Sequence, residues 1–344
     1  MRRSRIGEFE LIQRLRLATR IPRAVGNAVL AGIGDDAAVL KIRAGRTLLA
    51  TTDLLIERIH FDLAWTTYRQ LGFKAAMANL SDIAAMGGVP RFVLITVAAT
   101  PNQSLRDIEA LYAGVGDACQ RAKAAIVGGD TAASRVGLFV SLAVLGEAKP
   151  REVLRRSTAR TGDRLYVTGT LGDARAGLEI LRAQRQGRRD HATDARTEAY
   201  LMGRHLAPTA RLREARRLAE ARLVSAAIDL SDGLAGDIRH ICEESRVGCL
   251  IDGRQLPLSS PLLTHTRARQ RDPLEYALSG GEDYELLFTV PPTKVRRVER
   301  LIRRRQLRAT PIGRITPARQ GLRIIGTDDS VRPLAAKGYE HRLG

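Results

Sequence analysis

The sequence predicts an α/β protein with two domains. The chain has 344 residues, of which 44% are hydrophobic, so it can build two separate cores. Short apolar runs that are typical of strands alternate with segments in which apolar residues recur every three to four positions, as on one face of a helix. A new unit begins after Pro150, which predicts an N-terminal domain at 1–150 and a C-terminal domain at 151–344.

The elements of the N-terminal domain follow from this alternation. Apolar residues at helical spacing predict a first helix, and two strands joined by a turn at Ala44 and Gly45 come next. A long helix is expected to end at Gly87 and Gly88, ahead of Pro90, because glycine and proline terminate helices. The expected helices are 6–20, 68–86 and 105–121, and the expected strands are 39–42, 47–51, 91–99, 124–127 and 138–145.

The C-terminal domain has the same pattern. An apolar run that enters a turn at Gly169 predicts its first strand, and an arginine- and glutamate-rich helix is expected after Thr209. The segment 186–197 is polar and nearly free of apolar residues, which predicts a surface loop. The other expected elements are strands at 163–169, 226–230, 248–251 and 284–290 and helices at 174–185, 234–245 and 294–307.

The chain is strongly basic, with a formal net charge of +19. The excess is concentrated in 182–222 and 294–308, and the second segment has the apolar spacing of an amphipathic helix with a basic outer face. No aromatic residues interleave with these arginines, as a stacking platform for nucleic acid would require. We therefore interpret the excess charge as a solvated basic surface and expect no nucleic-acid partner.

Composition also argues against several other classes of protein. The apolar stretches 92–99 and 138–146 are the longest in the chain, and both are much shorter than the roughly 20 residues that span a bilayer. The basic N-terminus lacks the apolar segment of a signal peptide, so we expect a cytoplasmic protein with no membrane partner. Cys119, Cys242 and Cys249 form no CxxC pair, and we expect buried thiols rather than a zinc site.

Short acidic segments at or near the ends of apolar stretches are the strongest functional signal. In each one an Asp stands beside a small or hydroxyl residue. Carboxylates gathered at strand ends would repel one another and raise each other's pKa values unless a cation lay among them. Mg²⁺ fits best, because it binds through a few carboxylates, retained waters and substrate phosphates. The segments are 34–38, 51–53, 79–82, 128–131 and 228–233.

Five segments, in order along nearly the whole chain, resemble the motifs of the thiamine-monophosphate kinase family. They are GIGDDAA at 32–38, NLSDIAAMG at 79–87, IVGGDT at 126–131, IDLSDGL at 228–234 and LSGGEDYEL at 278–286. That family belongs to the aminoimidazole-ribonucleotide-synthetase-like ATP-binding superfamily. The resemblance implies the two-domain α/β (α+β) fold of the superfamily. Its N-terminal domain is expected to bind ATP and Mg²⁺ and to form a homodimer through its sheet, and its C-terminal domain to complete the active site.

The resemblance also implies an enzyme that phosphorylates thiamine monophosphate to thiamine diphosphate, with ATP as co-substrate and several Mg²⁺ ions as cofactors. The sequence contains neither a G-x-x-x-x-G-K-[S/T] loop nor the protein-kinase signatures, so the phosphates must be bound by another design. The nucleophile would be a phosphate oxygen that is already ionised near neutral pH. A general base is then not obligatory, and catalysis can come from positioning and charge neutralisation.

The same resemblance assigns roles to individual residues. The expected catalytic residues are Asp53, Asp130 and Arg156. The expected metal ligands are Asp35, Thr51, Thr52, Asp53, Asp82, Asp130, Asp229 and Asp232. The expected ATP-binding residues are Gly129, Asp130, Arg156 and Ser231, and the residues on the thiamine-phosphate side are His60, Glu282 and Tyr339. An arginine suits a phosphate because its guanidinium binds two oxygens at once and keeps its charge.

Alternative functions remain open on the sequence. A selenophosphate-synthetase-like enzyme of the same superfamily would carry a reactive Cys or selenocysteine with a Lys near its N-terminus, and this chain has no Cys and no Lys before Lys41. Aminoimidazole ribonucleotide synthetase fits less well, because 51–53, His60 and 279–285 follow the thiamine kinase pattern. A basic nucleic-acid-binding protein on a degenerate kinase fold conflicts with the intact acidic segments, since carboxylates repel phosphates unless metals intervene.

Overall fold

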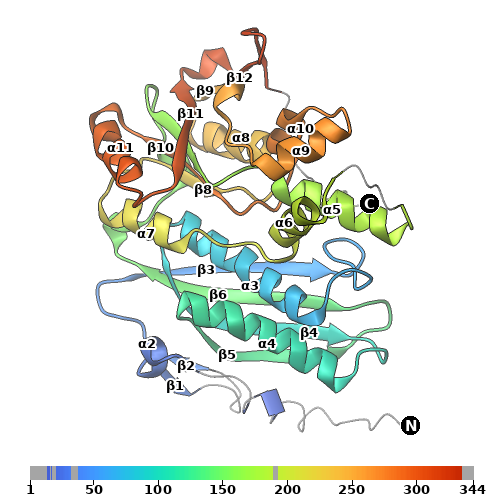
Figure 1. Cartoon of the computed structure of the whole chain (residues 1–344). Helices are drawn as coiled ribbons and strands as arrows, with labels where there is room; N and C mark the ends of the chain where they lie inside the picture. Colours follow the sequence, from blue (N-terminus) through green and yellow to red (C-terminus); the bar gives the residue numbers. More distant parts are fainter. Residues whose placement is uncertain (1–13, 16, 18–20, 32–37, 189–192, 335–344) are drawn as a thin grey trace. The chain divides into compact units, whose positions relative to one another are not determined.

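The chain folds into two compact units, each with its own sheet and core (Figure 1). The computed structural model describes residues 14, 15, 17, 21–31, 38–188 and 193–334. The first unit comprises Met1–Ile83 and Gly88–Arg151, and the second comprises Ala84–Gly87 and Glu152–Gly344.

The N-terminal unit is built on a four-stranded sheet with the strand order β3-β6-β4-β5. β4 runs parallel to β5 and antiparallel to β6, and β6 runs antiparallel to β3. Buried and half-buried residues alternate along most of β6, so one face of the sheet is fully buried. The strands are β3 (Thr47–Ile56), β4 (Val89–Ala99), β5 (Ala125–Ala133) and β6 (Phe139–Ala148).

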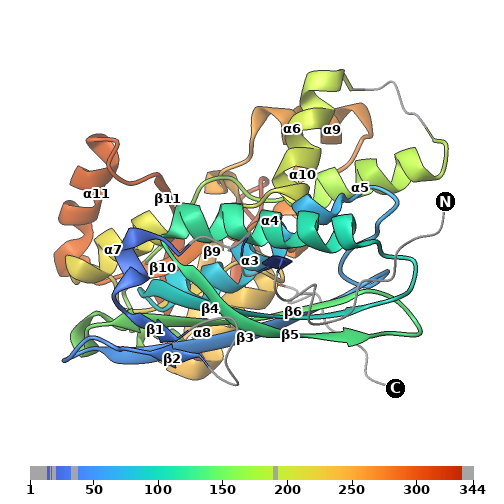
Figure 2. The same ribbon diagram turned by 90° about the horizontal axis from the view of Figure 1, so that it is seen from below.

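Two long helices, α3 and α4, cover the buried face of this sheet (Figure 2). They cross at close range, because a Cβ on Gly72 would overlap the carbonyl oxygen of Leu111 and a Cβ on Gly114 would overlap that of Arg69. Their apolar residues and those of the sheet form the core of the unit. The helices are α3 (Tyr68–Ala85) and α4 (Leu105–Ala122).

The opposite face of the sheet is only partly covered. Val25 and neighbouring apolar residues pack at one end of it, against Phe92 and Val127. Farther along the face, Leu48 and Leu54 of β3 remain 45% and 50% exposed. The covering elements are α2 (Arg23–Gly26), β1 (Val29–Ala31) and β2 (Val39–Leu40), in which β1 and β2 pair antiparallel.

The C-terminal unit is built on a seven-stranded sheet with the order β13-β12-β9-β11-β7-β10-β8. Neighbouring strands are antiparallel, except that β12 runs parallel to β9. Leu165 and Val167 of β7 face one core and Tyr166 faces another, so both faces of the sheet are buried. The strands are β7 (Arg164–Thr168), β8 (Ala227–Asp229), β9 (Gly248–Asp252), β10 (Leu286–Val290), β11 (Ala309–Thr316), β12 (Leu322–Ile325) and β13 (Val331–Pro333).

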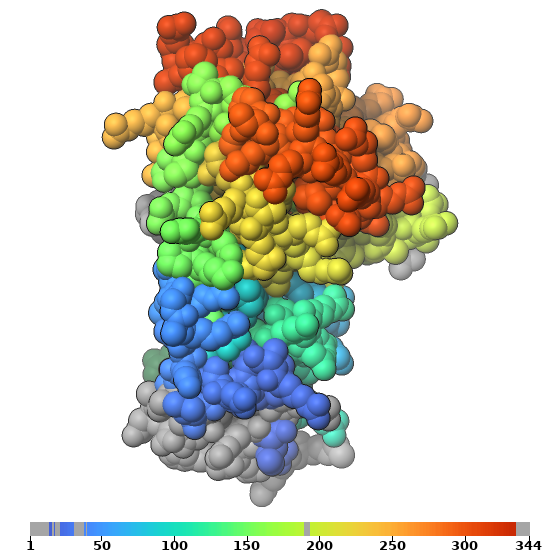
Figure 3. Space-filling view, turned by 90° about the vertical axis from the view of Figure 1, so that its left-hand side faces the viewer, coloured from blue at the N-terminus to red at the C-terminus, as the bar shows by residue number. Residues whose placement is uncertain are grey.

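Helices cover both faces of this second sheet. α8 contributes Ile238 and Ile241 to the first core, and α7 and α11 contribute Leu218 and Val298 to the second. α7 (yellow) and α11 (orange) lie next to each other on the surface, where their outer sides carry exposed arginines (Figure 3). The helices here are α7 (Leu212–Glu220), α8 (Leu234–Ser245) and α11 (Val295–Arg303).

A separate group of helices packs beside this sheet around Leu201, Leu262 and Tyr276. A Cβ on Gly177 of α5 would overlap the carbonyl oxygen of Leu201 of α6, so these two helices also touch through backbone. The group consists of α5 (Asp173–Arg185), α6 (Ala195–Leu206), α9 (Ser260–Ala268) and α10 (Pro273–Ser279).

Several expected elements differ from the structure. The expected strand pair 39–42 and 47–51 is wrong: Leu40 pairs with Val29, and β3 pairs with β6 along its whole length. The ten residues of β6 offer β3 a far longer ladder than the two of β2. Most of the helix expected at 6–20 lies outside the described residues.

Two segments that were expected to lie between regular elements also differ from the structure. β5 continues to Ala133, so 128–131 lies inside a strand and not beyond its end. α6 begins at Ala195, so the last residues of the loop expected at 186–197 are helical.

The three cysteines are buried free thiols, as predicted. Within the described residues, no helix combines the length and the apolar character that a membrane crossing requires.

Candidate active site

In the N-terminal unit, three of the predicted metal ligands come together. Oγ1 of Thr51 on β3 donates a hydrogen bond to Oδ2 of Asp82 on α3, at 2.6 Å. Because alternate residues of a strand share a face, Asp53 lies on the same side of β3 as Thr51. Burial, together with the charge of Asp82, raises the pKa of Asp53 to about 6. We call Thr51, Asp53 and Asp82 the N-terminal acidic group.

A buried amide fixes the backbone at Asp53. Oδ1 of Asn79 accepts a hydrogen bond from the backbone N–H of Asp53 at 3.0 Å, and Nδ2 of Asn79 donates to the carbonyl oxygen of Ala75 at 3.0 Å. The hydroxyl of Ser141 donates to the carbonyl oxygen of Asp53 at 2.9 Å. The carboxylate of Asp53 therefore projects from a backbone that is held on both sides.

The side chain of Thr52 does not join the N-terminal acidic group. It is exposed, and its Oγ1 donates to the carbonyl oxygen of Leu142 on the neighbouring strand, at 2.9 Å. By strand alternation it points to the opposite face of the sheet from Thr51 and Asp53.

Gly129 and Asp130 lie inside β5. A Cβ at position 129 would overlap the carbonyl oxygen of Ile95 on β4, so only glycine permits this approach. Asp130 is exposed, and its Oδ1 accepts a hydrogen bond from the backbone N–H of Thr131 at 2.8 Å. Its charge adds to the effect of burial in raising the pKa of Tyr112 on α4 to about 12.

Strand register relates Asp130 to the N-terminal acidic group. Asp53 pairs with Leu142, Leu142 with Ile95, and Ile95 with Gly129. Three strand spacings of about 4.8 Å put the ends of this row about 14 Å apart. Asp53 and Gly129 thus end the same row on opposite edges of the sheet, and Asp130 begins the next row, where it pairs with Thr96.

His60 lies in the turn that follows β3. Its Nδ1 accepts a hydrogen bond from the backbone N–H of Ile56 at 3.0 Å, and the backbone N–H of His60 donates to the carbonyl oxygen of Ile56 at 2.9 Å. An imidazole that accepts at Nδ1 carries its proton on Nε2. The half-buried ring is therefore fixed in orientation and tautomer.

In the C-terminal unit, two sequence motifs are joined by backbone hydrogen bonds. The N–H of Glu282 donates to the carbonyl oxygen of Ser231, and the N–H of Tyr284 donates to that of Leu230, both at 2.8 Å. The N–H of Leu230 donates to the carbonyl oxygen of Glu285, also at 2.8 Å. The predicted nucleotide-side segment at 228–233 therefore lies directly against the predicted thiamine-side segment at 278–286.

A second acidic group forms where β8 leads into α8. The backbone N–H of Asp232 donates to Oδ2 of Asp237 at 3.1 Å, and ligand atoms of Asp232, Asp237 and His240 all lie within 4.8 Å of one another. Burial, together with the charges of Asp232 and Asp229, raises the pKa of Asp237 to about 8, and the charge of Arg156 opposes this rise. Arg156 therefore lies within electrostatic reach of this group.

The segment that contains Glu282 is held in place by two buried acidic side chains. Asp283 accepts hydrogen bonds from the backbone N–H groups of Gly172 at 2.8 Å and Ala174 at 3.4 Å, at the start of α5. Glu285, which is fully buried, binds Arg204 at 2.9 Å and also binds Arg211. These contacts fix the residues on either side of Tyr284, and with them the backbone of Glu282.

Glu282 and Tyr284 have φ angles of +66° and +50°, a left-handed conformation that is uncommon for residues other than glycine. Such backbone persists only where its surroundings impose it, and it clusters at ligand-binding segments.

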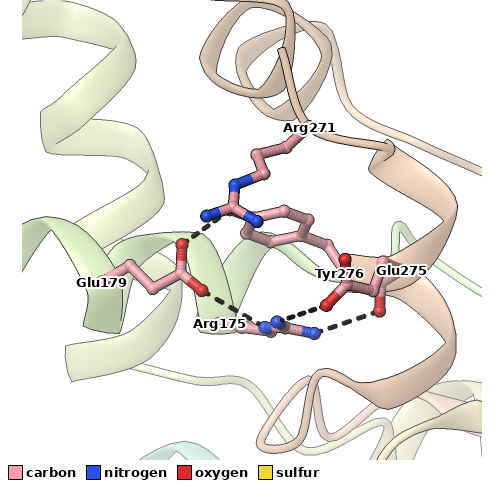
Figure 4. A pocket seen from close by; sticks show the side chains of 5 residues that line it. All are labelled: Arg175, Glu179, Arg271, Glu275 and Tyr276. Atoms are coloured by element: carbon pink, nitrogen blue, oxygen red, sulfur yellow. Dashed lines mark hydrogen bonds and ion pairs between the residues drawn. The ribbon is translucent and has the colours of Figure 1, made fainter. Parts of the chain in front are cut away.

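Arg175 lies beside this segment in a hollow that is lined by Arg175, Glu179, Arg271, Glu275 and Tyr276 (Figure 4). Its guanidinium donates to Oγ of Ser279 at 2.7 Å and to Oε1 of Glu275 at 3.0 Å, and it stacks over the ring of Tyr276. Glu179 also binds Arg175 at 3.3 Å and accepts from the hydroxyl of Tyr276 at 2.6 Å. The charged groups of this hollow neutralise one another, so we assign it to structural support.

Comparison with known proteins identifies the family. The chain matches the family model "AIR synthase related protein, N-terminal domain" over residues 34–148 and "AIR synthase related protein, C-terminal domain" over residues 160–325. It is 39% identical over 336 residues to the thiamine-monophosphate kinase of Escherichia coli (strain K12), covering 97% of this chain and 98% of the relative. The chain belongs to the thiamine-monophosphate kinase family.

Solved structures of the family have the same fold. The thiamine-monophosphate kinase from Stenotrophomonas maltophilia K279a superposes with a TM-score of 0.79 at 34% identity, covering 96% of this chain and 98% of that one. A structure described as AaThiL complexed with AMPPCP and TMP superposes with a TM-score of 0.76 at 33% identity, covering 99% of both chains. The predicted two-domain fold of the superfamily is thereby confirmed.

The structure brings together some of the residues that the family resemblance singles out, within each unit. Thr51, Asp53 and Asp82 form one group, and Asp229 and Asp232 lie in the other. Asp35 and Tyr339 lie outside the described residues.

Three neighbours of these groups are not predicted from the sequence: Asn79, Asp237 and His205, whose Nδ1 lies 3.0 Å from Glu282. A polar residue inside an otherwise apolar helix pattern is the signal that would have found Asn79 and Asp237.

Proposed function

We propose that this chain transfers the γ-phosphoryl group of ATP to the phosphate of thiamine monophosphate, forming thiamine diphosphate and ADP. The observation that carries the proposal is the 39% identity to a thiamine-monophosphate kinase over 97% of the chain. The relative that holds AMPPCP and TMP supports it, because AMPPCP is an analogue of ATP and TMP is the acceptor.

Mg²⁺ is the cofactor that best suits the carboxylate and hydroxyl oxygens of the two acidic groups. The N-terminal acidic group offers only oxygen atoms, and the pKa of Asp53 is raised first by burial and then by the like charge of Asp82, which a divalent cation would offset. Asp229 and Asp232 offer further carboxylates, and Asp237 adds one that the sequence did not predict. When bound, Mg²⁺ would neutralise phosphate oxygens and orient them for in-line transfer.

The protein's own groups bind and position the reactants. The guanidinium of Arg156 can bind two oxygens of a nucleotide phosphate at once. Gly129 lets β5 pass close to the carbonyl oxygen of Ile95 on β4, which sets the path of the backbone beside Asp130. Ser231 offers a hydroxyl beside Asp232. The nucleophile is an ionised phosphate oxygen, so we assign no residue as a general base.

His60 and Glu282 are proposed to recognise thiamine monophosphate, together with Tyr339. A proton on Nε2 gives His60 a donor for a phosphate or ring nitrogen. Glu282 is an acceptor for the amino group of the pyrimidine or a partner for the cationic thiazolium. Tyr339 can stack against an aromatic ring of the substrate.

We also propose that the chain forms a homodimer through the partly covered face of the four-stranded sheet. Leu48 and Leu54 are about half exposed there, and alternate residues of β6 on the same face remain half-buried. Apolar patches on a sheet face are typical of protein–protein contacts.

An ADP-release assay with Mg²⁺, ATP and one of three acceptors tests the proposed reaction. Thiamine monophosphate should stimulate ADP formation, whereas thiamine and selenide should not. ADP formation that depends on selenide would favour the selenophosphate-synthetase-like alternative. ADP formation with none of the three would contradict the proposal.

A further inference from the structure

The C-terminal end of α6 lies against Glu282, the predicted thiamine-side residue. Nδ1 of His205 is 3.0 Å from Oε2 of Glu282. The side chain of His205 is 4% exposed and that of Glu282 is 29% exposed, so a buried group contacts one that reaches the surface. His205 belongs to none of the sequence motifs.

We propose that His205 is a positioning residue for thiamine monophosphate recognition, which it supports by orienting the carboxylate of Glu282. This inference rests on the proposed function. The backbone of Glu282 is fixed in the left-handed region and is tied to Ser231 at 2.8 Å. A long Glu side chain still has several rotamers, and contact with an immobile imidazole selects one of them.

His205 is immobile because α6 is anchored along its length. Asp194 caps the N-terminus of α6 by accepting from the backbone N–H groups of Arg196 and Thr197, at 2.9 Å each. Next to His205, Arg204 binds Glu285 at 2.9 Å and approaches Asp173 at 3.6 Å. The same helix turn therefore holds Glu285 through Arg204 and Glu282 through His205, three residues apart on one segment.

A histidine that merely fills the core would be replaceable by any side chain of similar size. His205→Phe keeps the ring volume and removes both nitrogens. His205→Asn places an amide nitrogen at nearly the same distance from the backbone as Nδ1, whereas His205→Gln places it one carbon farther away. His265→Phe is a matched control, because His265 is a buried histidine on α9 that packs edge-on against Tyr276.

Steady-state kinetics of these variants, with each substrate varied in turn, test the proposal. His205→Phe and His205→Gln should raise KM for thiamine monophosphate about tenfold or more, as expected for loss of a close polar contact with a charged group. KM for ATP should change less than about twofold, and His205→Asn should recover most of the affinity for thiamine monophosphate. Combining His205→Phe with Glu282→Gln should add little to the effect of Glu282→Gln alone.

Three results would contradict the positioning role of His205. Unchanged kinetics in His205→Phe, or equal losses for both substrates, would overturn the positioning role, as would the same selective loss in His265→Phe. The contrast between His205→Asn and His205→Gln decides the question if the Phe variant does not fold. A wild-type protein that forms no thiamine diphosphate would refute the proposed function instead.

Discussion

Asp53 combines a fixed backbone with a crowded carboxylate. Asn79 and Ser141 bind its backbone N–H and carbonyl, and Asp82 lies close enough to contribute to its raised pKa. The fold has therefore already brought negative charge together at this point. A cation can bind to it without a rearrangement of the protein.

Replacing Asp53 by Asn, or Asp130 by Asn, should lower kcat by about 10²-fold or more, because each change removes negative charge where metals must hold two polyanions together. Circular dichroism should show an unchanged fold, since Asn retains the size of Asp. The rate of ADP formation measures the effect. Wild-type turnover in either variant would remove that residue from the catalytic set.

Asp283 predicts how stability depends on pH. Its pKa is raised from an ordinary value of 3.8 to about 8, first by burial and then by the charges of Asp173 and Glu285. The folded state therefore holds a proton that the unfolded state has lost between these two values. Stability should be highest below about pH 4 as far as this group is concerned, and its contribution is lost as pH rises towards 8, by at most about 1.4 kcal/mol per pH unit.

Asp283→Asn should weaken this dependence, because an amide cannot ionise yet still accepts from Gly172. Urea unfolding at pH 6 and pH 8, with a chelator present to remove metal, gives the free energy of unfolding. The loss between the two pH values should be smaller in the variant. A variant with the same or a larger loss would show that Asp283 is ionised throughout.

The predicted phosphate-binding arginine and the exposed arginines at the end of α5 lie on elements with different contacts. Arg156 belongs to a short 3-10 helix, η2 (Arg156–Thr158), whose carbonyl at Arg156 accepts from the hydroxyl of Ser245 at 2.7 Å, at the end of α8. Arg182, Arg185 and Arg188 lie exposed at or just beyond the last turn of α5. Of these arginines, Arg156 is the one tied to α8, the helix that carries Asp237 and His240 of the second acidic group.

Arg156→Gln should therefore impair the kinase severely, about 10²-fold in kcat/KM. A triple change of Arg182, Arg185 and Arg188 to Gln should leave it within about twofold of wild type, because solvent screens exposed charges. Both variants are compared at low and physiological salt. A triple variant as defective as Arg156→Gln would assign the end of α5 to the reaction.

Elements with strong apolar periodicity are predictable from the sequence, and elements that depend on tertiary contacts are not. The helix expected at 234–245 is α8 residue for residue. α6 is missed because its first residues belong to the segment expected to be a loop, and it forms through the Asp194 cap and packing of Leu201. β11 is missed because it contains Pro311 and Gly313, which the sheet accommodates at an irregularity in register.

The residues of the candidate site divide in the same way, into those that sequence motifs predict and those whose roles depend on tertiary contacts. The acidic motifs predict Asp53, Asp82, Asp229 and Asp232 as ligands directly, because Mg²⁺ prefers carboxylate oxygens. Asn79 and His205 act through the backbone of Asp53 and the carboxylate of Glu282, so their roles depend on which elements the fold brings together.

For the whole molecule, charge and apolar surface are unevenly distributed. The net charge of +19 coexists with two acidic groups, since many arginines lie on the outer sides of α7 and α11. The exposed leucines of β3 lie instead on a sheet face of the N-terminal unit. We expect the basic surface to remain solvated and the apolar face to be covered by a second copy of the chain.

Leu54→Asp should convert the proposed dimer into a monomer, because burying an unpaired carboxylate in an apolar interface is unfavourable. Light scattering during size-exclusion chromatography gives the mass. Leu263→Asp is the control, since Leu263 is 39% exposed on α9 in the other unit. A wild-type monomer, or a dimer that survives Leu54→Asp, would contradict the proposed interface.

In the proposed reaction the phosphoryl group passes directly from ATP to thiamine monophosphate. ³¹P NMR of a reaction that contains only the protein, Mg²⁺, ATP and thiamine monophosphate tests it most directly. The resonances of thiamine diphosphate and ADP should grow together in a one-to-one ratio, without inorganic phosphate. Formation of AMP, or of inorganic phosphate in place of thiamine diphosphate, would contradict it.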